Sequence, residues 1–280
     1  MKATLLCCSL FLPVLCAQPP GGGRGFGRGG SPMMNQANQL DLDGKGAQAR
    51  ELFQKAIDTA ATPAAKANAE RAMAMSWAFE GNCAKTGEYE QKVMDYWATQ
   101  EAAQPGQAFY QQGEMADEAA RVCIDAGDLD AAARWYKKGH DIGLQEPNIS
   151  ADRKALWEFR YEHAQARIAA RRGNKQEAER HVAAAKAVLG QMTDSRQQQE
   201  RFLPYLTGYV AFYMGDYKTA LADFEKANQD PFIECMIGET YEKLGDKDKA
   251  LEYYRQAFAA ARAHNPPAAY ARLVARKKVG

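Results

Sequence analysis

Two stretches of the sequence repeat the same arrangement of glycine, aspartate, alanine and aromatic residues. Residues 208–220 read GYVAFYMGDYKTA and residues 238–250 read GETYEKLGDKDKA, and each is followed four residues later by an aromatic, Phe224 or Tyr254. A glycine suits the end of one helix, and an aspartate caps the start of the next. Glycine and alanine at the outer positions let two helices cross closely, and the aromatic fills the space between pairs. The pattern therefore predicts stacked pairs of antiparallel helices.

The same arrangement recurs upstream with fewer matching positions. From residue 47 onward the chain is rich in Ala, Glu, Lys, Gln, Arg and Leu. Its apolar residues fall at helical spacing, and no alternating Val/Ile-rich run indicates a strand. The turn glycines of the successive pairs are predicted at Gly44, Gly87, Gly127, Gly173, Gly215 and Gly245. Because their spacing is uneven, helix or loop lengths must differ between pairs.

These stretches resemble the tetratricopeptide repeat, whose helix pairs recur with a period of about 34 residues. The run AAARWYKKG at 131–139 is also similar to the second helix of a Sel1-type repeat. The resemblance runs from about 47 to 264 and is strong only in 200–260, and the repeats are expected over 41–265. It implies an all-α fold, a right-handed α-solenoid of about five antiparallel helix hairpins with half a repeat at its start. Residues 266–280 begin with Pro266-Pro267 and predict one more helix, which would cap the end of the stack.

The N-terminus indicates export. Lys2 precedes a mostly apolar run, residues 3–17, which is shorter than the roughly 20 residues that span a bilayer. We therefore expect a signal peptide over 1–17, cut after Ala17, with lipidation of Cys16 as the alternative. Residues 18–40 are rich in Gly, Pro and polar residues and predict a disordered linker. The mature chain is expected in the periplasm or outside the cell, without membrane insertion, and the signal is bacterial in style.

No group of residues in the sequence predicts catalysis or a cofactor. The four histidines, His140, His163, His181 and His264, include no pair spaced three or four residues apart, so no metal-ligand pair forms locally on a helix. There is no nucleophile elbow, phosphate-binding loop or kinase motif. A formal net charge of +1 provides no general attraction to nucleic acid. We therefore expect a non-enzymatic protein with no cofactor, no metal and no nucleic-acid partner.

Three cysteines, Cys83, Cys123 and Cys235, follow the predicted signal peptide. Cys83 and Cys123 each stand four residues before a predicted turn glycine, at equivalent places in adjacent hairpins. A disulfide needs Cα atoms within about 7 Å, whereas neighbouring helices lie about 8 to 10 Å apart. This spacing favours buried free thiols, with a disulfide between Cys83 and Cys123 as the alternative. Cys235 is expected to be a free thiol.

In tetratricopeptide repeats the first helix of each pair lines a concave groove, and the resemblance implies which side chains face it. Counting back from Gly173 gives a basic stripe, and counting back from Gly215 gives an aromatic stripe. The implied peptide-binding residues are Arg160, His163, Arg167, Arg171, Phe202, Tyr205, Tyr209 and Phe212. Counting back from Gly127 gives a more acidic strip, which includes Glu114, Asp117 and Asp125.

These stripes suggest how a partner would be held. Arginines grip carboxylates in a forked arrangement, and tyrosines bind with little loss of entropy. The function that follows is an interaction scaffold that holds a polypeptide segment of a protein partner. Aromatics at helical spacing are also common in cores, and arginines on solvated helix faces, so each stripe has an ordinary structural explanation. Two functional alternatives remain: an envelope receptor for a glycan or small molecule, and a structural protein that associates with itself.

Overall fold

The computed structural model describes residues 31–280, and that part of the chain contains fourteen α-helices and no strand. The predicted all-α solenoid is confirmed. Twelve of the helices form six consecutive hairpins: α1 (Pro32–Leu42) with α2 (Gly46–Asp58), α3 (Pro63–Ala78) with α4 (Cys83–Ala98), α5 (Pro105–Ala126) with α6 (Leu129–Gly143), α7 (Ala151–Arg171) with α8 (Lys175–Gln191), α10 (Leu203–Tyr213) with α11 (Tyr217–Phe224), and α12 (Pro231–Leu244) with α13 (Lys247–Ala260). The short α9 (Arg196–Glu200) precedes α10, and α14 (Pro266–Val279) ends the chain.

The first hairpin is complete, so the predicted half-repeat and part of the predicted linker 18–40 are wrong. Helix α1 begins at Pro32, one residue after Ser31, whose hydroxyl caps the helix by accepting a hydrogen bond from the Met34 N–H. Serine at the cap and proline at the first helical position are standard helix-start features. The Gly/Pro-rich composition of the preceding residues makes these two features hard to recognise in the sequence. The predicted signal peptide 1–17 and the first part of the linker lie outside the described residues.

Each hairpin turns at a glycine with a left-handed backbone, and one predicted turn was misplaced. The glycines with positive φ are Gly44, Gly81, Gly127, Gly173, Gly215 and Gly245. Gly81, followed by the capping residue Asn82, therefore replaces Gly87 as the turn of the second hairpin. Gly87 instead lies within α4, where a Cβ atom would come 2.9 Å from the Trp135 ring. Residue 87 is a glycine because α4 packs closely on α6.

With the turn at Gly81, the repeat pattern brings an unusual residue into the core. Nine residues after their turn glycines, the other hairpins place Phe53, Tyr136, Val182, Phe224 and Tyr254. The second hairpin places Glu90 there, fully buried. Burial, and then the neighbouring charge of Glu118, raise the pKa of Glu90 well above its usual range. The second hairpin therefore holds a carboxyl group where its neighbours hold mostly aromatic rings.

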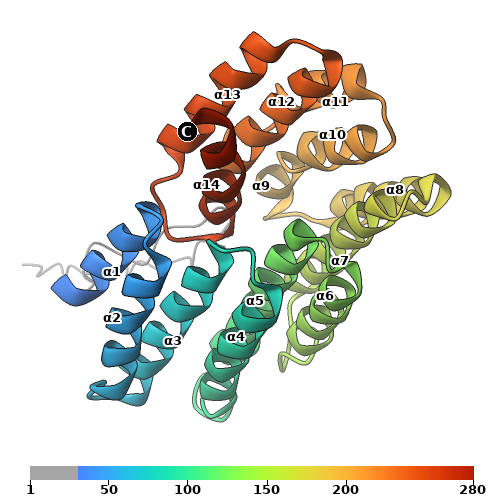
Figure 1. Ribbon diagram of the computed structural model, residues 1–280. Coiled ribbons are helices and arrows are strands. Elements are labelled where there is room, and N and C mark those ends of the chain that lie inside the picture. Colours follow the sequence, from blue (N-terminus) through green and yellow to red (C-terminus); the bar gives the residue numbers. More distant parts are fainter. Residues whose placement is uncertain (1–30) are drawn as a thin grey trace, which may run out of the picture.

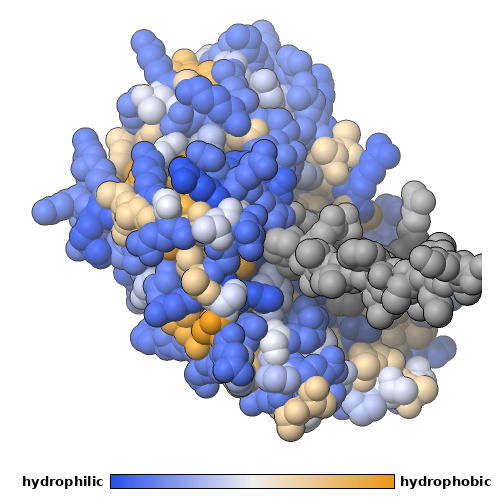
Figure 2. Space-filling view, turned by 180° about the vertical axis from the view of Figure 1, so that it is seen from behind, coloured by the Kyte–Doolittle hydropathy of each residue, from blue (hydrophilic) through white to orange (hydrophobic). Residues whose placement is uncertain are grey.

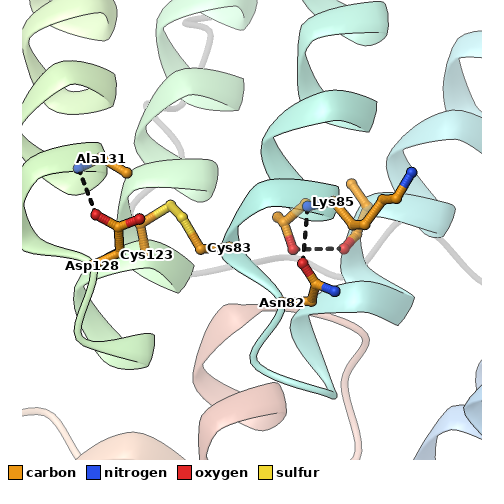
Figure 3. Close-up of a disulfide and its surroundings, with 8 residues drawn as sticks. Asn82, Cys83, Lys85, Cys123, Asp128 and Ala131 are labelled. Carbon is orange, nitrogen blue, oxygen red and sulfur yellow. Dashed lines mark hydrogen bonds between the residues drawn. A yellow bond between two sulfur atoms is a disulfide. The ribbon is translucent and has the colours of Figure 1, made fainter.

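Cys83 and Cys123 form a disulfide, so the favoured expectation of two free thiols is wrong and the alternative is correct. Their Cα atoms are 4.6 Å apart. Cys83 is the first residue of α4, and Cys123 lies in the last turn of α5, so the bond joins the ends of two helices (Figure 3). The spacing of 8 to 10 Å applies to helix axes along their length, whereas helix ends can approach more closely. Cys235 is free and buried, as expected.

The row of hairpins curves until its two ends meet. In Figure 1 it runs from α1 at the left, past α8 at the right, to α13 at the top, and α14 returns to the side of α3. Helix α14 packs on α12 and α13 and also contacts α3 and α5. A helix at 266–280 is therefore present, but it lies between the two ends of the row. Among the described helices, none is long and apolar enough to cross a bilayer.

The disulfide should contribute substantially to stability, because it closes a loop with a sequence separation of 40. Replacing Cys83 and Cys123 by alanine should lower the free energy of unfolding by about 3 to 4 kcal/mol through the larger entropy of the unfolded chain. Urea unfolding with and without reductant measures the effect. Reductant should destabilise the wild type and leave the double variant unchanged. Equal stability of oxidised wild type and double variant would contradict the prediction.

Glu90 should make the stability fall with rising pH. Because the pKa of Glu90 is raised in the folded state, the stability that its protonated carboxyl group provides is fully present below the unfolded-state pKa of about 4.3. That stability is lost as the pH rises through the folded-state pKa. Glu90→Gln keeps the size and shape of the side chain and cannot ionise. At pH 8 it should be about 1 to 3 kcal/mol more stable than the wild type, and near pH 4 about equal. The exposed control Glu88→Gln should change stability by less than about 0.5 kcal/mol.

Candidate functional site

The first helices α5, α7, α10 and α12 turn one side toward the interior of the curve, and these side chains form the inner face. Contacts between helices that are not consecutive show that the face is strongly curved. The guanidinium of Arg121 on α5 lies 4.7 Å from the ring centroid of Phe232 on α12 and 5.8 Å from that of Tyr205 on α10. All eight residues predicted to bind a peptide come from α7, α10 or the residue before α10, and most of them reach this face.

Arg167 forms the centre of the inner face. It donates hydrogen bonds to the Tyr205 hydroxyl at 2.9 Å and to the Tyr136 hydroxyl at 2.7 Å, and its guanidinium also lies over the Tyr209 ring. The His163 ring lies 5.2 Å from the Tyr205 ring. Burial, and then the charges of Arg167 and Arg121, lower the pKa of His163 well below its usual range. The histidine is therefore neutral at pH 7.

Five of the eight predicted residues are buried within the chain. Only 5% of Arg167, 7% of Tyr205 and 1% of Tyr209 is exposed. The buried members of the predicted set are His163, Arg167, Tyr205, Tyr209 and Phe212. These side chains lie under the surface of the inner face and offer little area for a peptide to contact.

The other three predicted residues, Arg160, Arg171 and Phe202, are partly exposed. Both arginines are already engaged. Arg160 pairs with Glu114 and donates to the Tyr110 hydroxyl, and Arg171 donates to the backbone carbonyl of Ile124. The expected arginine grip on a partner's carboxylate therefore has no open guanidinium among the predicted set. Arg160 and Arg171 thus bond to the neighbouring helix α5, and Arg167 bonds to tyrosines of α6 and α10.

Two carboxyl groups of α5 also lie on the inner face, and unlike the arginines they are not paired. Asp117 and Asp125 are partly exposed. Neither makes a hydrogen bond among the contacts of residues 31–280. Burial raises the pKa of Asp117 to about 7 and that of Asp125 to about 6, against the lowering effect of nearby arginines. Both carboxylates can therefore accept hydrogen bonds from a bound molecule when ionised.

A third carboxyl group extends this acidic part of the face onto α12. Glu239 accepts a hydrogen bond from the Tyr270 hydroxyl at 2.6 Å, and burial raises its pKa. Counting back from Gly127 predicts Asp117 and Asp125 on the inner face, and Glu239 is not among the predicted residues. Glu239 lies six residues before Gly245, so the same counting rule would have found it if applied to the last hairpin.

A hollow of about 460 Å³ lies on the opposite side of the hairpins, between α4 and α6. The half-buried Trp135, Gln91 and Lys138 line it, together with Cys83 of the disulfide. The hydropathy surface seen from behind is mostly hydrophilic, with small scattered apolar areas (Figure 2). Within the described residues, Leu244 is the one large hydrophobic residue that is exposed. Neither observation indicates a broad apolar docking surface.

Comparison with known proteins finds a family match for one part of the chain. Residues 235–264 match the tetratricopeptide repeat model. The last hairpin of the chain is therefore similar to the tetratricopeptide repeat. Similar solved structures include nearly identical TPR-like repeats from Podosopora anserina, with 14% identity, a TM-score of 0.41, and coverage of 81% of this chain and 92% of that one. Another is a tetratricopeptide repeat protein from Parabacteroides merdae, with 13% identity, a TM-score of 0.37, and coverage of 81% and 91%. No curated protein matches the sequence.

Tetratricopeptide repeat proteins generally act as scaffolds for protein–protein interaction and are generally not enzymes. The matched repeat spans the last hairpin of this chain, which carries Glu239 on its first helix. Among residues 31–280, no group of three or more His, Cys, Asp or Glu side chains is arranged to hold a metal ion. The arginines of the inner face contact a carboxylate, tyrosine hydroxyls and a backbone carbonyl of the same chain.

Arg167 should prove to be a structural residue. Arg167→Ala leaves the hydroxyls of Tyr136 and Tyr205 without their donor in a buried place, so it should lower the free energy of unfolding by roughly 2 to 4 kcal/mol. Thermal or urea unfolding checks the value. The neighbouring Arg172, whose side chain is 46% exposed and pairs with the exposed Asp130, is the matched control. Arg172→Ala should cost less than about 0.5 kcal/mol, and an equal loss in both variants would contradict the assignment.

Proposed function

We propose that this protein is an exported interaction scaffold that binds a polypeptide segment along its inner face. The observation that carries the proposal is the pair of partly exposed carboxyl groups, Asp117 and Asp125, which lack hydrogen-bond donors within the described chain. A buried or half-buried acceptor without a donor is unfavourable unless water or a ligand supplies one. A polypeptide offers such donors in its backbone N–H groups and in lysine and arginine side chains.

The chemistry of the partner follows from which charges are already neutralised. Arg160 pairs with Glu114, and Arg171 bonds to a helix-terminal carbonyl. A partner carboxylate would therefore have to compete with these contacts, whereas a donor to Asp117 or Asp125 would not. We infer a segment that brings amide donors and a basic side chain, in place of the acidic segment that the sequence suggested.

The disulfide supports the export part of the proposal. Disulfides persist in oxidising compartments and are rare in the cytosol of most organisms. The bond between Cys83 and Cys123 is thus in keeping with the signal peptide expected over residues 1–17. We propose the periplasm or the extracellular space as the place of action.

Glycan binding, the alternative suggested by the aromatic stripe, finds less support on the inner face. Stacking on a sugar requires an open ring face, and Tyr205 and Tyr209 are buried. The hollow beside the half-buried Trp135 is the feature that favours this alternative, since ligand pockets commonly have volumes of about 300 to 1,000 Å³. Gln91 and Lys138 line the same hollow, where the Lys138 ammonium donates to the Gln91 side-chain carbonyl.

The test uses a displayed peptide library selected against the mature protein at pH 7.5. We expect enriched segments that carry lysine or arginine, and binding weakened at least about tenfold by Asp117→Asn with Asp125→Asn. Binding should also weaken as pH falls from 7.5 to 5.5, because both carboxylates become protonated below their raised pKa values of about 7 and about 6.

Glu179→Gln, which removes one carboxylate at a side chain 63% exposed on α8, is the control and should bind like the wild type. Equal binding by all three proteins would place the binding surface elsewhere. If the selection enriches no segment, the polypeptide proposal fails and glycan binding becomes the leading alternative.

A further inference from the structure

The hollow between α4 and α6 contains hydrogen-bond donors that are unpaired within the described part of the chain. Trp135, Arg134 and Lys138 line it from α6. The Trp135 Nε1–H and the exposed Arg134 guanidinium make no hydrogen bond to any of residues 31–280. The Lys138 ammonium donates to the Gln91 side-chain carbonyl and forms no ion pair within the same residues. One helix therefore presents two cations and an indole N–H to the same hollow.

Both acidic side chains that line the hollow are already engaged. Glu88 pairs with Lys85 at 2.7 Å and with Lys92 at 3.4 Å. Asp128 caps α6, where its carboxylate accepts a hydrogen bond from the Ala131 N–H at 3.0 Å (Figure 3). An anion that entered the hollow would therefore meet free donors, and the nearby carboxylates would be neutralised or occupied.

The Lys138 ammonium lacks a close counterion. It is half-buried and lies 4.9 Å from the centroid of the Trp135 ring. Burial lowers the pKa of Lys138, and the more distant charge of Asp95 opposes this effect only in part. Asp95 in turn accepts a hydrogen bond from the Gln91 amide at 2.7 Å. A partly desolvated cation of this kind is stabilised when a bound anion supplies the missing negative charge.

The walls of the hollow are held in place before any ligand binds. Cys83, which lines the hollow at the start of α4, is bonded to Cys123 near the end of α5. The missing side chain of Gly87 lets the Trp135 ring pack directly on α4. The volume of about 460 Å³ lies within the range of roughly 300 to 1,000 Å³ that is usual for ligand sites. The hollow is therefore a preformed site.

The groups in the hollow define the chemistry of a ligand. Lys138 and Arg134 require an anionic group, and guanidinium groups bind carboxylates through two parallel hydrogen bonds. The Trp135 N–H requires a further acceptor, and the partly exposed indole can pack against an apolar ring face. A polypeptide would bring an N–H donor with nearly every carbonyl, although the hollow has few free acceptors. A sugar hydroxyl can rotate and act as an acceptor. A uronic acid combines carboxylate, hydroxyls and ring face.

We propose that this hollow binds an acidic glycan. A uronate carboxylate binds to Lys138 and Arg134, a neighbouring hydroxyl accepts from the Trp135 N–H, and the sugar ring packs on the indole. The hollow lies on the opposite side of the hairpins from the inner face. It is a second binding site and does not depend on the proposed polypeptide binding. A protein with both sites can hold a polypeptide while it is attached to an acidic polysaccharide.

Isothermal titration of the mature protein with trigalacturonate tests the proposal. We expect saturable binding, with a dissociation constant of about 1 mM or lower. Arg134→Gln with Lys138→Gln should weaken binding at least about tenfold. The matched control is Lys137→Gln with Lys175→Gln, whose lysines are 65% and 71% exposed and do not line the hollow. This control should bind like the wild type. The trimethyl ester, which keeps the sugar rings and lacks the charges, should bind at least about tenfold more weakly than the acid.

Two further measurements separate the possible outcomes. Binding should change the tryptophan fluorescence of the wild type and leave that of Trp135→Phe unchanged. Asp117→Asn with Asp125→Asn should bind trigalacturonate like the wild type, so that failure of the inner-face proposal is distinguishable. Absence of binding, equal binding of acid and ester, or equal losses in the two double variants that remove cations would overturn the inference. Tighter binding of the peptide acetyl-Gly-Glu-Gly-amide than of trigalacturonate would assign the hollow to acidic polypeptides and also overturn it.

Discussion

The close crossing of helices at residues without side chains is the constraint on which this structure depends. Trp157 is 1% exposed because it packs directly against two glycines, Gly113 and Gly143, where a Cβ atom would come within 2.3 Å of the ring. Gly208 under Phe224 and Gly238 under Tyr254 repeat the arrangement in the last two hairpins. Each ring fills the volume that a missing side chain leaves, at the density typical of protein interiors. The stack consequently tolerates different helix lengths as long as these crossings are kept.

The same constraint explains how much of the fold could be predicted from the sequence. Gly208, Gly215 and Ala220 recur in register at Gly238, Gly245 and Ala250, and this pattern led to the correct all-helical solenoid. However, a glycine can either end a helix or let two helices pack closely, and the sequence alone does not distinguish these two roles. The repeat pattern predicts a turn at Gly87, whereas Gly87 lies within α4 and makes room for Trp135. The true turn at Gly81 was recognisable from the capping residue Asn82 that follows it.

The inner face shows a different limit of sequence reasoning. Periodicity identifies the side of a helix on which a residue lies, and it correctly brought His163, Arg167, Tyr205 and Tyr209 together. It does not reveal how close the opposing helices come. Here the curvature brings α5 and α12 together, so that Arg121 reaches Phe232 and the central residues are buried. Nor does it show that Tyr136, from the second helix of a hairpin, would supply a hydrogen-bond acceptor for Arg167.

The meeting of the two ends also changes how such a stack can unfold. In an open solenoid each repeat touches only its neighbours, so terminal repeats fray independently and unfolding proceeds inward from them. Here α14 contacts α3, and Arg276 bonds to Leu42, so the first and last hairpins are neighbours as well. A circular arrangement has no terminal repeat to fray. The hairpins should therefore lose their structure together, with a cooperativity closer to that of a globular domain than to that of a linear array.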